Sequence, residues 1–406
     1  MSSVGNSFAI WRTWFVAGAL LLCLAYRLLS VHNGRHQMAD FRVYYDAAVA
    51  LKGDTQVYGL AFGVSSGFYK YAPVAAAAFI PFTWMDYGTA SHVYYALVVL
   101  GILLIILLFV REVQKQMGEG SYAWLFLFPV IFLADHLERE LHLGNVNIFL
   151  ILLAYCVFRC IRNGREWMAG ALFALIIVFK PHFLVLAPWI VWKQQWRAIC
   201  SFAVALPLLM LLPALITGWT GNYDLHLQWL GAMRDHNVHL AESPNTIYGM
   251  ISQWVLRPLG MKPTTWFVPV VFGLAALALL FYMLYLDARN PRWKLVHFIE
   301  FFLPLALVPN LVHTDTEHFM WTMPLLFLIA ALMRESWQGK WVFWPFLVAA
   351  FIPYSLNSPD LVGRELAKRF DEGGGLGIAN LIIVGVALVM HQRYHQRRTA
   401  PEIPAI

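Results

Sequence analysis

The sequence predicts an all-α integral membrane protein that crosses the bilayer many times. Hydrophobic residues make up 60% of the 406 positions and charged residues only 13%, whereas a soluble domain carries about 25% charged residues. Long apolar runs recur along the chain, and aromatic residues, which suit the membrane–water interface, make up 16%. A soluble fold of this length could not bury so much apolar surface, so we expect a single membrane domain over residues 1–406.

About twelve apolar segments are candidates for transmembrane helices. A spanning helix needs roughly 20 apolar residues, and several segments are shorter than that. The segment 70–84, with Pro73 and Pro81 near its ends, either spans or lies at the interface. The predicted spans are residues 9–30, 88–110, 121–135, 143–161, 167–180, 183–193, 197–217, 264–287, 296–312, 318–334, 341–356 and 375–391.

The distribution of basic residues predicts the orientation. The net charge is +6, and the Lys and Arg residues concentrate in one set of short loops, as the positive-inside rule predicts for cytoplasmic loops. This pattern favours membrane topology over nucleic-acid binding. Both termini, including the tail 392–406, should then face the cytoplasm. The long loops 31–87 and 218–263 should face outward from the cytoplasmic (inner) membrane, and interfacial helices are expected in the first of them.

Long ordered loops are usually functional, so we expect the chemistry at the outer face. Asp40 follows the first helix and precedes apolar residues at helical spacing. It is either the N-cap of an interfacial helix or a general base held at the membrane surface.

A second polar cluster surrounds Gly144 between two apolar segments. Charged groups at membrane depth are costly and tend to be functional, although a helix-end cap with Arg139 reaching toward headgroups explains the pattern equally well. The other members of the cluster that we consider as site residues are Glu140, Asn145 and Asn147.

Two further places carry polar groups next to apolar segments. Lys180 ends the apolar run 169–179, and it either anchors that helix at the interface or neutralises a phosphate on a lipid carrier. His313 and His318 lie in the segment His-Thr-Asp-Thr-Glu-His, whose spacing is not that of a zinc motif. We interpret this segment as a polar wall in which a histidine donates to phosphate oxygens, without a metal. The four cysteines match neither a zinc site nor a disulfide framework.

Short motifs along the chain resemble those of the family 87 glycosyltransferases, which are polyprenyl-phosphate-mannose-dependent enzymes of the GT-C type with some arabinofuranose-transferring relatives. In this sequence Asn145 stands at the family's usual Gln, and Thr316 precedes Glu317-His318 where the family has Ser-Trp. The motifs are Asp40-Phe-x-x-Tyr-Tyr, Gly53, Tyr58, Tyr71-x-Pro73, Pro81, Gly144-Asn-Val-Asn147, Ala169-Gly170, Lys180-Pro181, Asn245-Thr246 and Glu317-His318.

The resemblance implies a GT-C fold and an inverting, metal-independent transfer of a sugar, mannose first, from a polyprenyl-phosphate donor to a glycolipid or glycan hydroxyl. It implies that Asp40 is the general base and that no cofactor takes part. The donor phosphate would be bound by Lys180, Arg139 and His318. The acceptor or sugar would be bound by Tyr44, Tyr71, Glu140, Asn145, Asn147, Asn245 and His313.

A lipid or solute transporter, such as a flippase, is the alternative function. Transporters often contain inverted repeats and polar residues near the middle of their helices. Here the charged residues gather at helix ends and no internal repeat is evident, which favours the enzyme.

Overall fold

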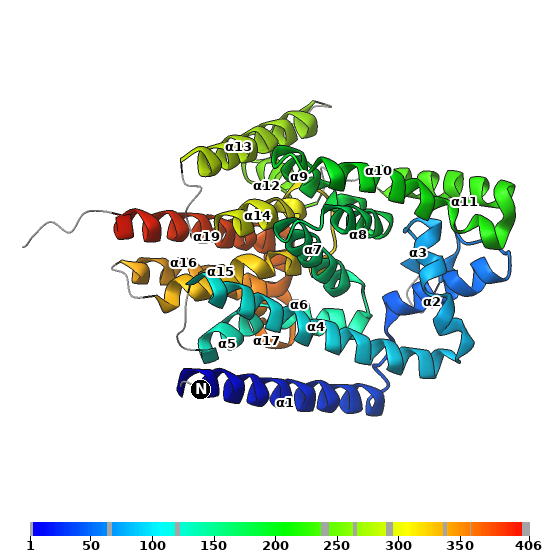
Figure 1. Ribbon diagram of the computed structural model, residues 1–406, viewed down its shortest axis with the longest axis horizontal. Coiled ribbons are helices and arrows are strands. Elements are labelled where there is room, and N and C mark those ends of the chain that lie inside the picture. Colours follow the sequence, from blue (N-terminus) through cyan, green and yellow to red (C-terminus); the bar gives the residue numbers. More distant parts are fainter. Residues whose placement is uncertain are drawn as a thin grey trace, which may run out of the picture. The chain divides into compact units, whose positions relative to one another are not determined.

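The computed structural model describes residues 3–62, 67–117, 122–236, 243–262, 266–289, 295–335, 339–357 and 359–399. It confirms the helical class: helices form nearly all of its regular structure (Figure 1). In the described residues the strands are β1 (Ala61–Phe62) and β2 (Gly67–Phe68), which pair antiparallel. Parts of the expected loop 218–263 and of the tail 392–406 lie outside the described residues.

The chain forms two compact units. Unit 1 contains residues 1–13, 106–137 and 239–406, and unit 2 contains residues 14–105 and 138–238. The helices α1 (Ser3–His32), α4 (Tyr87–Met117) and α6 (Ala134–Leu143) contribute residues to both units.

Unit 2 is built around α8, which packs against α7 and α10. Gly170 allows this packing, since a Cβ atom there would lie 2.1 Å from the backbone oxygen of Ala198. Besides the helices shared with unit 1, the helices of this unit are α2 (Ala39–Lys52), α3 (Pro73–Ala78), η1 (Ile80–Trp84), α7 (Asn147–Arg162), α8 (Glu166–Phe179), η2 (Pro181–Leu186), α9 (Ala187–Trp192), α10 (Trp196–Leu211) and α11 (Ala214–His236).

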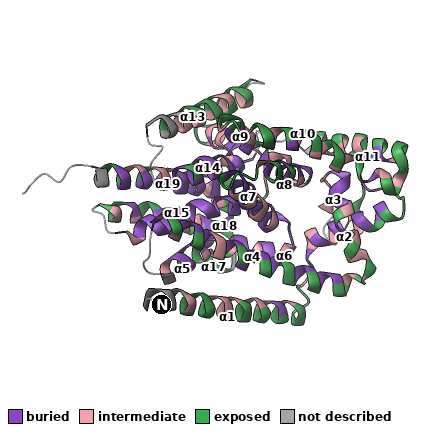
Figure 2. Cartoon of the chain, in the orientation of Figure 1, coloured by how far each residue is buried: buried purple, intermediate pink, exposed green. Residues whose placement is uncertain are grey.

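Unit 1 has α15 as its most buried helix, with every residue from Met323 to Met333 buried (Figure 2). Next to it, the amide of Asn380 donates to the Ala306 carbonyl at 2.8 Å and to Asn310 Oδ1 at 2.6 Å, so these buried polar groups are paired. The elements of the unit are α5 (Tyr122–Phe132), α12 (Ile247–Ile251), η4 (Ser252–Leu256), α13 (Phe267–Arg289), α14 (Val296–Leu311), η5 (Thr316–Thr322), α15 (Met323–Arg334), η6 (Lys340–Phe343), α16 (Trp344–Ser355), α17 (Pro359–Val362), α18 (Arg364–Glu372) and α19 (Gly375–Thr399).

Apolar helices make this a membrane protein, but the predicted number of about twelve spans is not confirmed. By length and composition, the described residues hold four candidate spans, or up to six if each of two bent helix pairs is one span. The pair α6 and α7 is bent by 112°. The candidate spans are Ala9–His32, Tyr87–Met117, Thr316–Arg334 and Gly375–Gln396.

Several predicted spans correspond to shorter helices. The segment 121–135 contains the 11-residue α5, and the segment 183–193 is divided between η2 and α9. The segment 70–84, left open above, forms the six-residue α3 and the five-residue η1. Neither is long enough to cross a bilayer by itself, and the interfacial position of this segment stays a prediction.

Candidate active site

Asp40 lies in the first turn of α2, one residue after the helix begins. The N-cap interpretation of Asp40 is wrong, because Met38 occupies that position, with φ 43°, and makes no side-chain capping bond. The Asp40 carboxylate instead accepts a hydrogen bond at Oδ2 from the amide Nδ2 of Asn145, at 2.6 Å. The buried face of α2 fixes the helix, and therefore Asp40, in unit 2.

Gly144 allows the turn between α6 and α7 to approach the start of α2. Its φ is +67°, a conformation that favours glycine, and a Cβ atom there would lie 2.6 Å from Met38 Cε and 3.0 Å from Phe41 Cβ. In the same turn, Asn145 Oδ1 accepts from the backbone N–H of Val146 at 2.7 Å. The asparagine is therefore oriented with its NH2 group toward Asp40.

Lys180 follows α8 and is 5% exposed. Its ammonium donates to Asn147 Oδ1 at 2.6 Å and to Asn145 Oδ1 at 3.5 Å. The side chain therefore lies inside unit 2, which does not fit the alternative of an anchor extended toward headgroups.

Glu140 completes the chain of polar contacts from α6. Fully buried, it accepts from the backbone N–H of Ile148 at Oε1, at 2.9 Å, and from Asn147 Nδ2 at Oε2, at 3.2 Å. It thus satisfies an N–H at the start of α7. The five side chains form a continuous polar cluster, which we call the Asp40–Glu140 cluster: Asp40, Asn145, Lys180, Asn147 and Glu140.

Two tyrosines lie against this cluster. The hydroxyls of Tyr44 and Tyr71 are 3.0 Å apart, and Lys180 Nζ lies 6.0 Å from the centre of the Tyr71 ring. Burial raises the pKa of Tyr44 well above its ordinary value, with further contributions from Tyr71 and Asp40. The Tyr44 hydroxyl therefore acts as a neutral hydrogen-bonding group near neutral pH.

Arg139 is not brought into the cluster. It precedes Glu140 on α6, and adjacent helical residues point about 100° apart. Within the described residues, Arg139 makes no hydrogen bond or ion pair with the Asp40–Glu140 cluster.

Asn245, His313 and His318 belong to unit 1. Asn245 Oδ1 accepts from the backbone N–H of Gly377, at 3.0 Å, which ties this residue to α19. His318 Nδ1 lies 3.1 Å from the Asp315 carbonyl oxygen. His313 lies in the short segment between α14 and η5.

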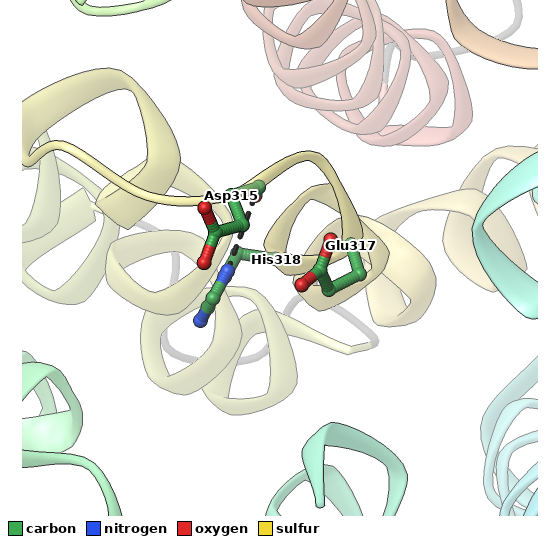
Figure 3. Close-up of side chains that lie close together, drawn as sticks. All are labelled: Asp315, Glu317 and His318. Atoms are coloured by element: carbon green, nitrogen blue, oxygen red, sulfur yellow. Dashed lines mark hydrogen bonds between the residues drawn. The ribbon is translucent and has the colours of Figure 1, made fainter. Parts of the chain in front are cut away.

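His318 also converges with two carboxylates (Figure 3). One potential ligand atom from each of Asp315, Glu317 and His318 lies within 4.8 Å of the others. Oxygen and imidazole donors of this kind suit a divalent cation. The sequence spacing did not indicate this convergence, because it is produced by the 3-10 helix η5, which begins at Thr316.

Sequence reasoning did not assign Tyr58 to the site. Its hydroxyl donates to the backbone oxygen of Tyr71 at 2.6 Å, so it fixes the segment that carries the second tyrosine of the site. The only sequence signal for Tyr58 is its place among the family-like motifs of the first long loop.

The fold and this geometry define a helical membrane protein with a cluster of carboxylates, amides and an ammonium, all buried except the half-buried Asp40. Residues 68–308 match the family described as Glycosyltransferase family 87, which is more than half of the chain. The chain therefore belongs to glycosyltransferase family 87, as its motifs predicted.

Curated relatives agree with this assignment. An alpha-(1->3)-arabinofuranosyltransferase of Corynebacterium glutamicum is 25% identical over 283 residues, covering 68% of this chain and 63% of the relative. The chain thus spans less than two thirds of that relative's length. A polyprenol-phosphate-mannose-dependent alpha-(1-2)-phosphatidylinositol mannoside mannosyltransferase of Mycolicibacterium smegmatis is 22% identical, covering 80% of this chain and 77% of the relative.

Among solved structures, the chain is similar to ArnT from Cupriavidus metallidurans bound to undecaprenyl phosphate. The match covers 99% of this chain and 82% of that one, at 15% identity and a TM-score of 0.39.

Proposed function

We propose that this protein is an inverting glycosyltransferase that transfers a sugar from a polyprenyl-phosphate donor to a hydroxyl of a glycolipid or glycan. Mannose is the first candidate for that sugar. The Asp40–Glu140 cluster is the observation that supports the proposal, because the Asp40 carboxylate and the Lys180 ammonium both contact the side chain of Asn145. The relatives named for arabinofuranosyl and mannosyl transfer support the sugar classes.

Asp40 is proposed as the general base. Its Oδ2 is oriented by Asn145, and a positioned carboxylate can accept the proton of an acceptor hydroxyl as that oxygen attacks the anomeric carbon. Tyr44 and Tyr71, which are hydrogen-bonded to each other, would orient the acceptor or sugar. Glu140, Asn145 and Asn147 would hold this arrangement, and Asn245 and His313 stay predictions for the acceptor side.

Lys180 is proposed as the main donor to the phosphate. As the acceptor oxygen bonds to the anomeric carbon, the bond from that carbon to the phosphate oxygen breaks and polyprenyl phosphate leaves as an anion. A fixed ammonium stabilises this developing charge without a proton transfer. The acceptor proton resides on Asp40 until water removes it. Arg139 and His318 are further candidates on their charge and hydrogen-bonding capacity.

The test uses Asp40→Asn, which keeps the size of the side chain and removes its basicity. Purified protein would receive polyprenyl-phosphate mannose and the arabinofuranose analogue, with glycolipid and oligosaccharide acceptors, and the products would be measured by mass spectrometry. We expect the wild type to transfer one of these sugars and Asp40→Asn to lose at least about a hundredfold in rate.

Asp46→Asn is the matched control. Asp46 lies on the same helix and pairs with Arg42 at 2.7 Å, and loss of one such pair costs only about 0.5 kcal/mol. The Asp46→Asn variant should keep its activity. Transfer by Asp40→Asn near the wild-type rate would rule out the base assignment.

We further propose that the site faces the exterior of the cytoplasmic membrane and that both termini face the cytoplasm. In a background without the four cysteines, an impermeant maleimide added outside should label Leu60→Cys, at an exposed position in the first long loop, but not Asn163→Cys, beyond α7. The opposite labelling would invert the topology.

A further inference from the structure

Unit 2 contains a second pocket that the proposed chemistry does not use. Its volume is about 660 Å³, and it lies between the end of α2, the segment that follows it and α11. We call it the α2–α11 pocket. The side chains on its wall that can hydrogen-bond are Asp54, Thr55, Gln56, Thr217, Asp224 and Gln228.

The composition of the wall indicates a neutral ligand rich in hydroxyl groups. Carboxylate and amide oxygens accept hydrogen bonds, and hydroxyls and amides also donate them. None of the described lining residues is Lys or Arg, and Asp54 and Asp224 are both acids. This wall disfavours a phosphate, so the donor's charged group is the wrong occupant.

Apolar surface and glycines complete the pocket. Leu51, Tyr58 and Leu225 line it and are buried, which provides an apolar floor for the C–H face of a sugar ring. Gly231 also lines it, and no atom lies within 4 Å of a Cβ built there. A ring can therefore approach the backbone of α11.

The α2–α11 pocket is physically linked to the Asp40–Glu140 cluster. Asp40 and Leu51 lie 11 residues apart on α2, which places them on the same face of the helix and about 17 Å apart along its axis. Tyr58 lines the pocket and donates to the backbone of Tyr71. Elsewhere on α11, Trp229 donates to the Lys70 carbonyl at 3.0 Å.

From these observations we infer that the α2–α11 pocket binds the sugar units of the acceptor that lie several residues away from the hydroxyl being glycosylated. This inference rests on the proposed function and specifies its acceptor: an oligosaccharide or the glycan of an extended glycolipid. A separation of about 17 Å exceeds the length of one sugar ring, so a single sugar cannot occupy the pocket and reach Asp40 together.

The test measures binding in the Asp40→Asn protein, where transfer does not interfere. The probes are α-linked manno-oligosaccharides of one to five units and the matching arabinofuranose series, titrated by calorimetry against protein in nanodiscs. We expect affinity in one series to increase with length, and Gly231→Leu, which adds a side chain to the pocket wall, to weaken binding of the longest probe about tenfold.

Gly273→Leu is the matched control, because Gly273 lies within α13 of unit 1 and also has no atom within 4 Å of an added Cβ. It should keep the length dependence. Asp224→Ala provides a second variant at an exposed position and should also weaken the longest probe. The inference is overturned if neither series gains affinity with length, or if both pocket variants bind the longest probe like their parent.

The two proposals fail in different ways. Length-dependent binding with no sugar transfer by the wild type would contradict the proposed function and leave the pocket assignment standing. Transfer by the wild type without length-dependent binding would contradict the pocket assignment and leave the proposed function standing.

Discussion

The side-chain amide of Asn145 donates to the carboxylate of Asp40 at 2.6 Å, although 105 positions separate the two residues in the chain. The oxygen of the same amide faces the ammonium of Lys180, at 3.5 Å. One asparagine therefore holds the proposed base and lies within reach of the proposed phosphate donor, so the positions of both groups depend on the turn that carries it.

That turn should be sensitive at Gly144. Gly144→Ala must accept a left-handed φ, at a cost of about 1–2 kcal/mol, and its methyl group would press against Met38 and Phe41 at the start of α2. We expect a lower melting temperature and a loss of at least about tenfold in kcat, because Asn145 and Asp40 are pushed apart.

Gly164→Ala separates the effect of backbone strain from the effect of displacing the turn at Gly144. Gly164 has a similar φ, +71°, but no atom within 4 Å of an added Cβ. It should lose comparable stability and keep its kcat. Equal effects of the two variants on kcat would show that the approach of the turn to α2 is unimportant.

Lys180→Met tests the proposed phosphate donor. Removing a fixed charge that stabilises a leaving anion should lower kcat by about 10²–10³-fold, and it should weaken inhibition by the product polyprenyl phosphate. Lys262→Met, at an exposed position in unit 1, is the control. Wild-type kcat with unchanged product inhibition would assign Lys180 a structural role alone.

A chelator tests the proposed metal independence. Purified protein dialysed against EDTA should transfer sugar at an unchanged rate, because the proposed stabilisation of the leaving phosphate uses Lys180. Loss of activity that Mn²⁺, Mg²⁺ or Ca²⁺ restores would contradict this. Glu317→Gln, which removes one donor from the convergent group with Asp315 and His318, would then test that group as the cation site.

Tyr44 predicts an alkaline limit to stability. Its pKa is raised in the folded protein, first by burial, so its contribution to stability is present below the unfolded pKa of about 10 and is lost as the pH rises through the folded value. Tyr44→Phe should reduce the alkaline destabilisation measured by denaturation at pH 9 and pH 11. At pH 7 it should cost about 1 kcal/mol through loss of the bond to Tyr71. An identical pH dependence in both proteins would contradict the argument.

Local patterns predicted the helices and the polar residues at their ends. The helical spacing after Asp40 correctly indicated α2, and the polar residues around Gly144 correctly marked a break between two helices. These features depend on near neighbours in the chain, so a single sequence reports them well.

Long-range features were less accessible. The capping alternative for Asp40 failed because the left-handed Met38 is the N-cap, two residues earlier, and nothing in the local sequence indicates that conformation. The pairing of Asp40 with Asn145 arises from the approach of the Gly144 turn to the start of α2, and the position of Lys180 between two asparagines follows from the packing of α7 against α8. The predicted number of spans is not confirmed, and one predicted span is divided into two short helices, η2 and α9, with Pro181 and Pro188 in their first turns.

The length of helix α2 is a property that protein engineering can change. With Asp40 in its first turn and Leu51 near its last residue, the helix acts as a rigid spacer. Inserting seven residues would add about two turns and about 10 Å while nearly preserving the face that both residues share. A lengthened enzyme of this kind should select longer acceptors, so the length of one helix becomes an adjustable determinant of glycan size.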